Sequence, residues 1–285
     1  MGGRFGEEDR WLSFARLDRF AEHGGRYVDT AHSYAEGRSE AVIGEWIRTH
    51  PETLRVITKI GHPDAAGNLD TSPQRLRAQV DESCRRLNKV QLDILLLHRD
   101  DRARSVAELA DSLLDCVHSG AARQIGVSNW ASDRLSELVP LLATEGHRPV
   151  VSYQFSLAEP SRPLWPGTHD VREAASIIAD HDLTLLGWAA QSRGFFAGNT
   201  ETVDGEGPNP FDNPVNRARR ERCRQLAERL DCRPETVALA WVLGASTAYP
   251  IVGPRSLTEL DISLEAMALD LDEATLIWLR HGTDV

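Results

Sequence analysis

Four side chains that could move a proton lie in or just after three successive apolar runs of the sequence. Asp29 and Tyr34 follow the first run, Lys59 lies in the second, and His98 follows the third. A buried tyrosine beside a lysine ammonium has its phenolate favoured, so we expect the pKa of Tyr34 to fall from its usual value of about 10. The Asp29 carboxylate would keep the lysine charged, and His98 would hydrogen-bond a substrate oxygen. Such a set makes a general acid that protonates an alkoxide, not a nucleophile.

Short runs of apolar and β-branched residues must position these side chains. Several runs are almost wholly hydrophobic, as in Ile94–Leu97, which is typical of parallel strands buried on both faces. Stretches with helical spacing lie between them, and Ser72-Pro73 and Arg233-Pro234 carry helix-start signals. The predicted strands are Arg26–Asp29, Leu54–Ile60, Leu92–His98, Arg123–Ser128, Val150–Phe155, Leu183–Trp188 and Tyr249–Val252.

Strands that alternate with helices predict an α/β fold, built either on an open doubly wound sheet or on a closed barrel. No predicted strand is followed by the G-x-G-x-x-G turn of dinucleotide-binding open sheets. Chemically capable residues instead end almost every strand, which is the arrangement of a barrel's active-site face. These residues are Asp29, Lys59, His98, Ser128, Asn129, Gln154, Trp188 and Arg255. The prediction is therefore a (β/α)8 TIM barrel that forms a single domain over residues 1–285.

Composition excludes several classes of protein. The chain of 285 residues is 41% hydrophobic and carries a formal net charge of −11, which argues against nucleic-acid and anionic-membrane partners. Its four cysteines have no C-x-x-C spacing, so no metal site is expected. No apolar run approaches the roughly 18 residues that cross a bilayer, and the N-terminus does not begin a signal peptide. We expect a cytoplasmic protein.

The spaced motifs of this sequence strongly resemble those of the aldo/keto reductases. The resemblance covers essentially residues 1–280 and implies a barrel that reduces carbonyl compounds with NAD(P)H. It implies that Tyr34 is the general acid, that Lys59 and Asp29 tune it, and that His98 orients the carbonyl. The matching motifs are Asp29-Thr30-Ala31-x-x-Tyr34, Gly37-Arg38-Ser39-Glu40, Thr58-Lys59, Leu97-His98-Arg99, Ile125-Gly126-Val127-Ser128-Asn129, Gln154, Arg193-Gly194-Phe195 and Pro250-Ile251-Val252-Gly253-Pro254-Arg255-Ser256.

The resemblance also implies where the cofactor binds. Ser128, Asn129 and Gln154 match the residues that hold the nicotinamide carboxamide, and Trp188 stands where the family usually stacks a tyrosine on the nicotinamide ring. The pyrophosphate contacts fall to a segment in which Ala-Ala-Gln replaces the more usual Ser-Pro-Leu, and so partly to backbone and to an arginine. The residues of that segment are Ala189, Gln191, Arg193 and Gly194.

The choice between the two nicotinamide cofactors depends on three residues. Gly253 and Arg255 fit the adenosine 2′-phosphate site, where a guanidinium can hold phosphate with two hydrogen bonds. Glu259 stands where the family often has Arg or Gln, and its carboxylate would repel that phosphate. We expect NADPH, with NADH possible. The substrate would be a small-molecule carbonyl compound, with His32 and Trp130 lining its pocket, and the oligomeric state is not indicated.

Two segments depart from the regular alternation. Residues 189–216 are rich in Gly, Pro, Asn and Asp, and so long a connection is usually a lid or mobile loop, here expected over the cofactor site. The first helical pattern begins so early that only Met1–Phe5 remain for the strand before it. We therefore expect a truncated first strand, with the true N-terminus upstream of Met1.

Two other functions remain open. Some relatives resemble regulatory subunits, so the alternative is a nucleotide-sensing binding module with little turnover. A metal-dependent hydrolase that uses Asp29, His32 and His98 on the same barrel is disfavoured, because the sequence lacks H-x-H and other dense ligand spacing.

Overall fold

The computed structural model describes residues 9–51, 53–199, 209–245 and 248–282. The chain divides into two compact units. The first comprises residues 1–152 and 172–184, and the second comprises residues 153–171 and 185–285.

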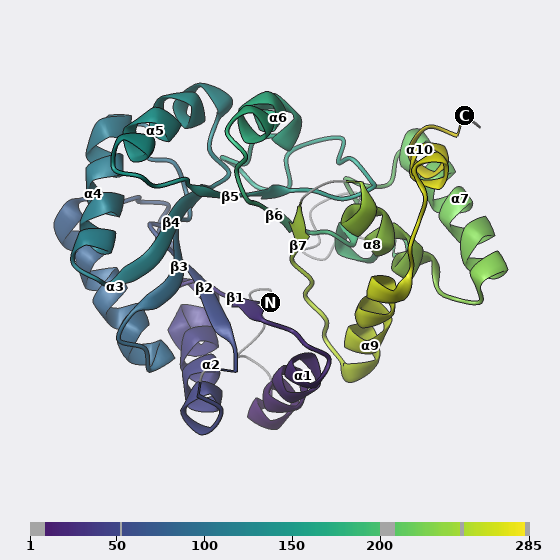
Figure 1. The fold of residues 1–285 in the computed structure, drawn as a ribbon, viewed down its shortest axis with the longest axis horizontal. Coiled ribbons are helices and arrows are strands. Elements are labelled where there is room, and N and C mark those ends of the chain that lie inside the picture. The colour runs from purple at the N-terminus through teal and green to yellow at the C-terminus, as the bar shows by residue number, and fades with distance from the viewer. Residues whose placement is uncertain (1–8, 52, 200–208, 246–247, 283–285) are drawn as a thin grey trace. The chain divides into compact units, whose positions relative to one another are not determined.

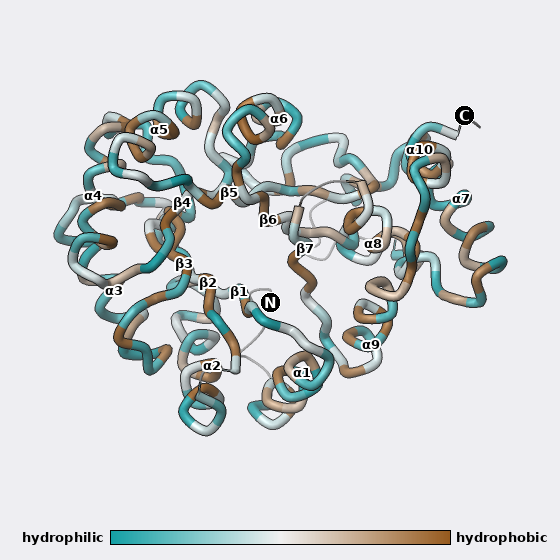
Figure 2. The backbone as a smooth tube through the Cα atoms, viewed as in Figure 1, coloured by the Kyte–Doolittle hydropathy of each residue, from teal (hydrophilic) through white to brown (hydrophobic). Residues whose placement is uncertain are grey.

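The first unit is built on parallel strands that follow one another in chain order, with neighbouring strands paired. Ile57 lies opposite Ile94, and Val127 lies opposite Val151. Figure 1 shows helices along the outer side of these strands, and Figure 2 shows hydrophobic stretches of the strands in brown. The elements are α1 (Arg10–Glu22), β1 (Tyr27–Asp29), η1 (Tyr34–Gly37), α2 (Arg38–Thr49), β2 (Arg55–Ile60), α3 (Pro73–Leu87), β3 (Leu92–Leu97), α4 (Val106–His118), β4 (Ala122–Ser128), α5 (Ser132–Thr144), β5 (Val150–Gln154) and α6 (Val171–Asp180).

Local sequence explains these elements. Ser72 caps α3 with Pro73 at its first position, and Ser105 and Glu108 form a capping box at the start of α4. Leu95, Leu96 and Leu97 of β3 are fully buried, as expected for a strand covered on both faces. Gly126 of β4 packs so closely on β5 that a Cβ there would collide with its backbone.

The second unit combines a short parallel strand pair with helices. Its apolar core includes Phe195, Phe211 and Trp241, and six residues of α8 from Val237 to Val242 are buried. Leu186 lies opposite Tyr249 in the strand pair. The elements are β6 (Leu185–Trp188), η2 (Ser192–Gly194), α7 (Pro214–Leu230), α8 (Pro234–Gly244), β7 (Tyr249–Pro250), α9 (Leu257–Glu265), η3 (Ala266–Ala268) and α10 (Glu273–His281).

The structure confirms all seven predicted strands to within a few residues, although β7 is only two residues long. It differs in the segment 189–216, because η2 forms inside it and α7 begins at Pro214, where Asn213 caps the helix. The truncated first strand lies outside the described residues, and so do residues 200–208 of that segment. A single domain over the whole chain stays a prediction. None of the helices in the described ranges is long and apolar enough to span a membrane.

Candidate active site

Three oxygens at the end of β1 hold the Lys59 ammonium, which β2 carries. Its Nζ donates to Oδ1 and Oδ2 of Asp29 at 2.6 and 2.7 Å and to the Thr30 carbonyl at 2.7 Å. Asp29 lies opposite Ile57, two residues before Lys59, so parallel pairing brings both side chains to one end of the sheet. Burial lowers the pKa of Lys59, but its interactions with the Asp29 carboxylate and with Tyr34 together outweigh burial and raise the pKa above the ordinary value. The ammonium is therefore charged at neutral pH.

Tyr34 lies beside this pair, at the start of η1, with Lys59 Nζ 5.2 Å from the centre of its ring. The expected fall in its pKa is wrong, because burial of the hydroxyl raises the pKa more than Lys59 lowers it. The Asp29 carboxylate that neutralises the lysine also raises the pKa of the phenol. Tyr34 thus stays protonated at neutral pH, which suits a proton donor better than a base.

His98 follows the end of β3 and is neutral. Its backbone N–H donates to the Ile60 carbonyl at 2.7 Å, which fixes the residue beside β2. Its ring packs edge-on against the Tyr34 ring, with centroids 5.6 Å apart. Burial, assisted by the nearby Lys59, holds the pKa of His98 well below its ordinary value. The structure therefore brings together the four residues that were predicted as catalytic.

Two further residues, His62 and Arg99, lie in this cluster and were not predicted as site residues. The His62 ring packs against His98 with centroids 4.7 Å apart, and its Nδ1 donates to the Pro63 carbonyl at 2.8 Å. Arg99 lies close enough to lower the pKa values of Tyr34, His62 and His98. Their place just beyond the ends of β2 and β3 was the signal in the sequence that could have identified them.

Side chains of α2 and α3 hold the backbone just before Tyr34. Arg86 of α3 donates to the His32 carbonyl at 3.2 Å and to the buried Glu40 carboxylate at 3.3 Å. Glu40 also accepts a hydrogen bond of 2.6 Å from Thr58, next to Lys59. Nε2 of His32 lies 2.7 Å from Oε2 of Glu82, so this ring is engaged with α3. A role of His32 in substrate binding stays a prediction.

The end of β4 contributes the residues predicted for the carboxamide in the first unit. Ser128 Oγ accepts a hydrogen bond of 2.8 Å from Asn129 Nδ2, and Asn129 has a left-handed backbone with φ of 60°. Trp130 is fully buried, with the Arg134 guanidinium 5.3 Å from its ring centre. Its place in a substrate pocket stays a prediction.

In the second unit, Gln154 ends β5 and Trp188 ends β6. Gln154 Nε2 donates to Ser156 Oγ at 2.8 Å, and the Trp188 ring lies 5.3 Å from the Trp165 ring. The Arg193 guanidinium lies 5.3 Å from the centre of the Trp165 ring. The turn that follows β6 has several left-handed residues, namely Ala189, Ser192, Arg193 and Gly194. Gln191 in the same turn accepts a hydrogen bond from Ser263 of α9.

Arg255 and Glu259 meet at the start of α9, shortly after Gly253. The Arg255 backbone N–H donates to Glu259 Oε2 at 2.6 Å, while the Glu259 backbone N–H donates to Ser256 Oγ at 3.1 Å. This reciprocal pattern resembles a capping box, so the Glu259 carboxylate stabilises the helix start. It binds backbone and not the Arg255 guanidinium.

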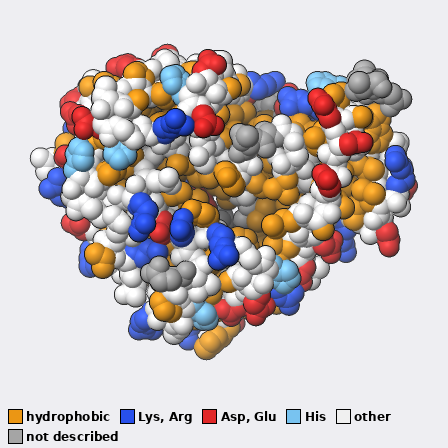
Figure 3. All heavy atoms as spheres, in the orientation of Figure 1, with side chains coloured by type: hydrophobic (Ala, Val, Ile, Leu, Met, Phe, Trp, Pro, Cys, Tyr) orange, Lys and Arg blue, Asp and Glu red, His pale blue; other side chains and the backbone are white. Residues whose placement is uncertain are grey.

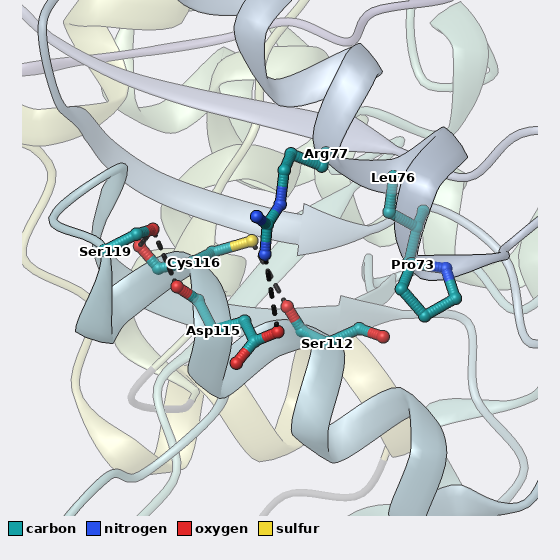
Figure 4. Close-up of a pocket in the computed structure, with 7 residues that line it drawn as sticks. All are labelled: Pro73, Leu76, Arg77, Ser112, Asp115, Cys116 and Ser119. Atoms are coloured by element: carbon teal, nitrogen blue, oxygen red, sulfur yellow. Dashed lines mark hydrogen bonds and ion pairs between the residues drawn. The ribbon is translucent and has the colours of Figure 1, made fainter.

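The hollow in Figure 4 lies between α3 and α4 and contains none of these residues. Burial raises the pKa of its Cys116 thiol to about 11, so this sulfur is a poor nucleophile. Acidic and basic side chains are interspersed on the face shown in Figure 3. The described ranges hold no cluster of three or more His, Cys, Asp or Glu side chains that could bind a metal.

Solved structures show the fold of the chain. Glycerol dehydrogenase from Gluconobacter oxydans matches with a TM-score of 0.80 at 19% identity, over 99% of this chain and 90% of that one. An aldo/keto reductase from Klebsiella pneumoniae, in complex with NADP and acetate, matches with a TM-score of 0.73 at 21% identity, over 95% and 84%. The predicted (β/α)8 fold class is confirmed by this likeness.

Sequence relatives agree. The chain is 26% identical to an aryl-alcohol dehydrogenase of Pestalotiopsis microspora, over 99% of this chain and 75% of the relative. It is 29% identical to norsolorinic acid reductase B of Aspergillus parasiticus, over 91% and 71%. The model of the "Aldo/keto reductase family" matches residues 2–277, and the chain therefore belongs to the aldo/keto reductase family.

Proposed function

We propose that this oxidoreductase reduces an aldehyde or ketone to an alcohol with NADPH, and that Tyr34 is the general acid. The observation that carries the proposal is the buried Asp29–Lys59 pair beside a protonated Tyr34 and a neutral His98. A nucleophile would have to be deprotonated or activated by a base. Here Tyr34 instead keeps its proton, next to the positive charge of the Lys59 ammonium.

Each side chain has one task in the proton transfer. Tyr34 donates its proton to the oxygen of the substrate as negative charge develops there, and the Lys59 ammonium stabilises the phenolate that remains. Asp29 keeps the ammonium charged and aimed. His98, being neutral, can donate one ring N–H to the same oxygen. A bound reduced nicotinamide would supply the hydride that the carbonyl carbon receives.

The donor groups at the predicted cofactor positions fit a nicotinamide dinucleotide. In the first unit, the Ser128 hydroxyl and Asn129 amide can pair with a carboxamide, and in the second unit Gln154 offers another amide. Trp188 supplies an aromatic surface for a nicotinamide ring. The proposed pyrophosphate contacts come from the turn after β6. Its residues are Ala189, Gln191, Arg193 and Gly194.

NADPH is preferred over NADH in this proposal because of the charges at the start of α9. The Arg255 side chain is free of ion pairs within the described ranges, whereas Glu259 accepts a backbone hydrogen bond. A guanidinium with no acidic partner favours a 2′-phosphate. Gly253, shortly before Arg255, leaves room for the ligand to approach the backbone.

The test is the Tyr34→Phe variant, which removes only the hydroxyl. We expect kcat for a neutral aldehyde such as benzaldehyde to fall by about 10³-fold or more, because general acid catalysis is lost. The dissociation constant for NADPH, measured by fluorescence titration, should change little. Wild-type turnover in Tyr34→Phe would contradict the assignment. Oxidation of one equivalent of bound NADPH without steady-state turnover in the wild type would favour the nucleotide-sensing module.

A further inference from the structure

One aromatic side chain of the second unit contacts two of the residues that the proposed function assigns to the cofactor. The Trp165 ring lies 5.3 Å from the Trp188 ring, with an angle of 46° between the ring planes, and the Arg193 guanidinium lies 5.3 Å from the centre of the Trp165 ring. Trp188 is proposed to face the nicotinamide ring, and Arg193 the pyrophosphate. Trp165 comes from neither of these segments but from the connection between β5 and α6, residues 155–170.

This connection is fixed to the sheet at both of its ends. The Phe155 backbone N–H donates to the Trp188 carbonyl at 3.2 Å, and Asp170 forms a parallel bridge with Gln154. The chain therefore leaves β5 beside Trp188 and returns beside Gln154, the residue proposed to bind the carboxamide. Both ends of the connection thus lie next to proposed cofactor residues.

Hydrogen bonds to α7 and α10 hold the first part of the connection. The Glu159 carboxylate accepts from Arg219 at 3.2 Å and from Arg280 at 3.0 Å. The Glu159 carbonyl accepts from the Asn216 amide at 2.7 Å. Because these partners come from two helices, this part of the connection has a fixed place on the helices of the second unit.

A tight turn then sets the direction of Trp165. The Thr168 backbone N–H and hydroxyl both donate to the Trp165 carbonyl, at 3.3 and 2.8 Å. Pro166 and Gly167 occupy the two central positions, and Gly167 has a left-handed φ of 72°. A type II turn favours this pair, because proline fixes φ at the first central position and glycine tolerates the positive φ at the second. The backbone of Trp165 is thus held, although the residue is 41% exposed.

The two ring contacts can prepare the cofactor site before the cofactor binds. An arginine side chain loses rotamer freedom when it binds a ligand, and that loss weakens binding. Contact with an aromatic ring restricts the guanidinium in advance and, unlike a carboxylate, does not cancel its charge. The same ring packs against Trp188, which has to present an aromatic surface to the nicotinamide. Trp165 can therefore orient both groups without reducing the attraction of Arg193 for a pyrophosphate.

We propose that Trp165 is a positioning residue for the dinucleotide cofactor, and that it holds Arg193 and Trp188 in the orientations that bind the pyrophosphate and the nicotinamide. The inference rests on the proposed function, from which the assignments of Arg193 and Trp188 come. It gives the connection between β5 and α6 a task in cofactor affinity. Binding of the adenosine end, proposed to lie at Arg255, should not depend on Trp165.

The probes are NADP and adenosine 2′-monophosphate, which carries the adenosine and the 2′-phosphate but neither the pyrophosphate nor the nicotinamide. Their dissociation constants are measured by isothermal titration calorimetry. Trp165→Leu removes the aromatic ring, Trp165→Phe keeps a smaller one, and Trp11→Leu is the matched control. Trp11 is an exposed tryptophan of α1 in the first unit, with the Arg10 guanidinium 4.8 Å from its ring centre.

We expect Trp165→Leu to weaken NADP binding by about tenfold and Trp165→Phe by about threefold or less, because preorganisation of the two side chains is lost or reduced. Neither variant should change the Kd of adenosine 2′-monophosphate by more than about twofold. An unchanged affinity for the monophosphate also shows that the second unit of the variant is folded. Trp11→Leu should bind both ligands as the wild type does.

Arg193→Gln distinguishes positioning from direct contact with the cofactor. This variant removes the guanidinium that Trp165 is proposed to hold, and it should weaken NADP binding by about tenfold. Adding Trp165→Leu to Arg193→Gln should weaken binding further by less than about threefold, because only the part that passes through Trp188 remains. The two losses therefore should not multiply.

Three results would overturn the inference: wild-type NADP affinity in Trp165→Leu, wild-type NADP affinity in Arg193→Gln, and losses that multiply in the double variant. An equal loss of affinity for both ligands in Trp165→Leu would also contradict it, because the ring would then support the second unit as a whole. Failure of the proposed function looks different. The Kd of NADP would still follow Trp165 and Arg193, while no carbonyl compound, benzaldehyde included, would be turned over.

Discussion

The Lys59–Asp29 pair of the first unit and the Arg255–Glu259 pair of the second unit use the same two charges in opposite ways. Asp29 binds the ammonium itself, with both carboxylate oxygens within 2.7 Å of Nζ. Glu259 binds the backbone N–H of Arg255 and leaves the guanidinium to other partners. A cation paired with a carboxylate can still tune a neighbouring proton but offers little excess charge to an incoming ligand, whereas a cation without an acidic partner can bind an anionic one.

Arg99 and Arg134 repeat this contrast within the first unit. Arg134 has the Asp100 carboxylate and two backbone carbonyls as partners, whereas Arg99 has a buried nitrogen without a partner among the described residues. The comparison separates cations that build the fold from cations that are available to ligands, and variants of each kind should behave differently.

The largest effect should follow the loss of Lys59. Lys59→Met leaves the Asp29 carboxylate buried without its cation, so we expect the free energy of unfolding to fall by about 3 to 5 kcal/mol. Carbonyl turnover should fall by about 10³-fold or more, because the phenolate of Tyr34 loses its stabilising charge. Urea unfolding and steady-state kinetics measure the two effects. A variant with wild-type stability would show that the pair is not what holds the ends of β1 and β2.

Removing Arg134 should cost stability, and removing Arg99 should not. Arg134→Gln leaves the Asp100 carboxylate without its guanidinium partner. Because this carboxylate is only 7% exposed, we expect a loss of about 3 kcal/mol in the free energy of unfolding. Arg99→Gln removes an unpaired cation and should change stability by less than about 1 kcal/mol. If urea unfolding showed equal losses of unfolding free energy in the two variants, Arg134 would not stabilise the fold more than Arg99 does.

Stability should also fall in acid because of His98. Its folded pKa lies well below 6.5, so below about pH 6.5 the unfolded chain binds a proton that the folded chain does not. This favours unfolding by about 1.4 kcal/mol per pH unit until the folded pKa is reached. His98→Gln should flatten the profile of unfolding free energy between pH 7.5 and pH 5. An unchanged slope in His98→Gln would mean that His98 already carries a proton in the folded protein.

The smallest effect concerns the second unit. Arg255→Ala should weaken NADPH binding by about tenfold and NADH binding much less, because only NADPH carries the 2′-phosphate. Glu259→Gln keeps the side-chain oxygen that caps α9 and removes the charge, so it should increase the preference for NADPH. Fluorescence titration gives the four dissociation constants. An equal loss for both cofactors in Arg255→Ala would exclude Arg255 from the phosphate site.

Much of the fold could be predicted because its signals are local. Nearly continuous apolar runs such as Ile94–Leu97 indicated buried parallel strands, and Ser72-Pro73 marked the start of α3. The start of α7 at Pro214 was missed, although Asn213-Pro214 is a cap followed by a first-turn proline. The absence of an apolar period before it favoured a loop, and the cap was the better signal.

The sequence by itself determined which residues end the strands, and with them the four proton-handling side chains Asp29, Tyr34, Lys59 and His98. Only the tertiary structure decided how their charges balance. The pKa of Tyr34 rises because burial and Asp29 together outweigh Lys59. Oδ1 of Asp100 binds the guanidinium of Arg134, which is 34 residues away in the chain, and not that of its sequence neighbour Arg99. Burial and long-range pairing set these energies, and neither is written in the local pattern of residues.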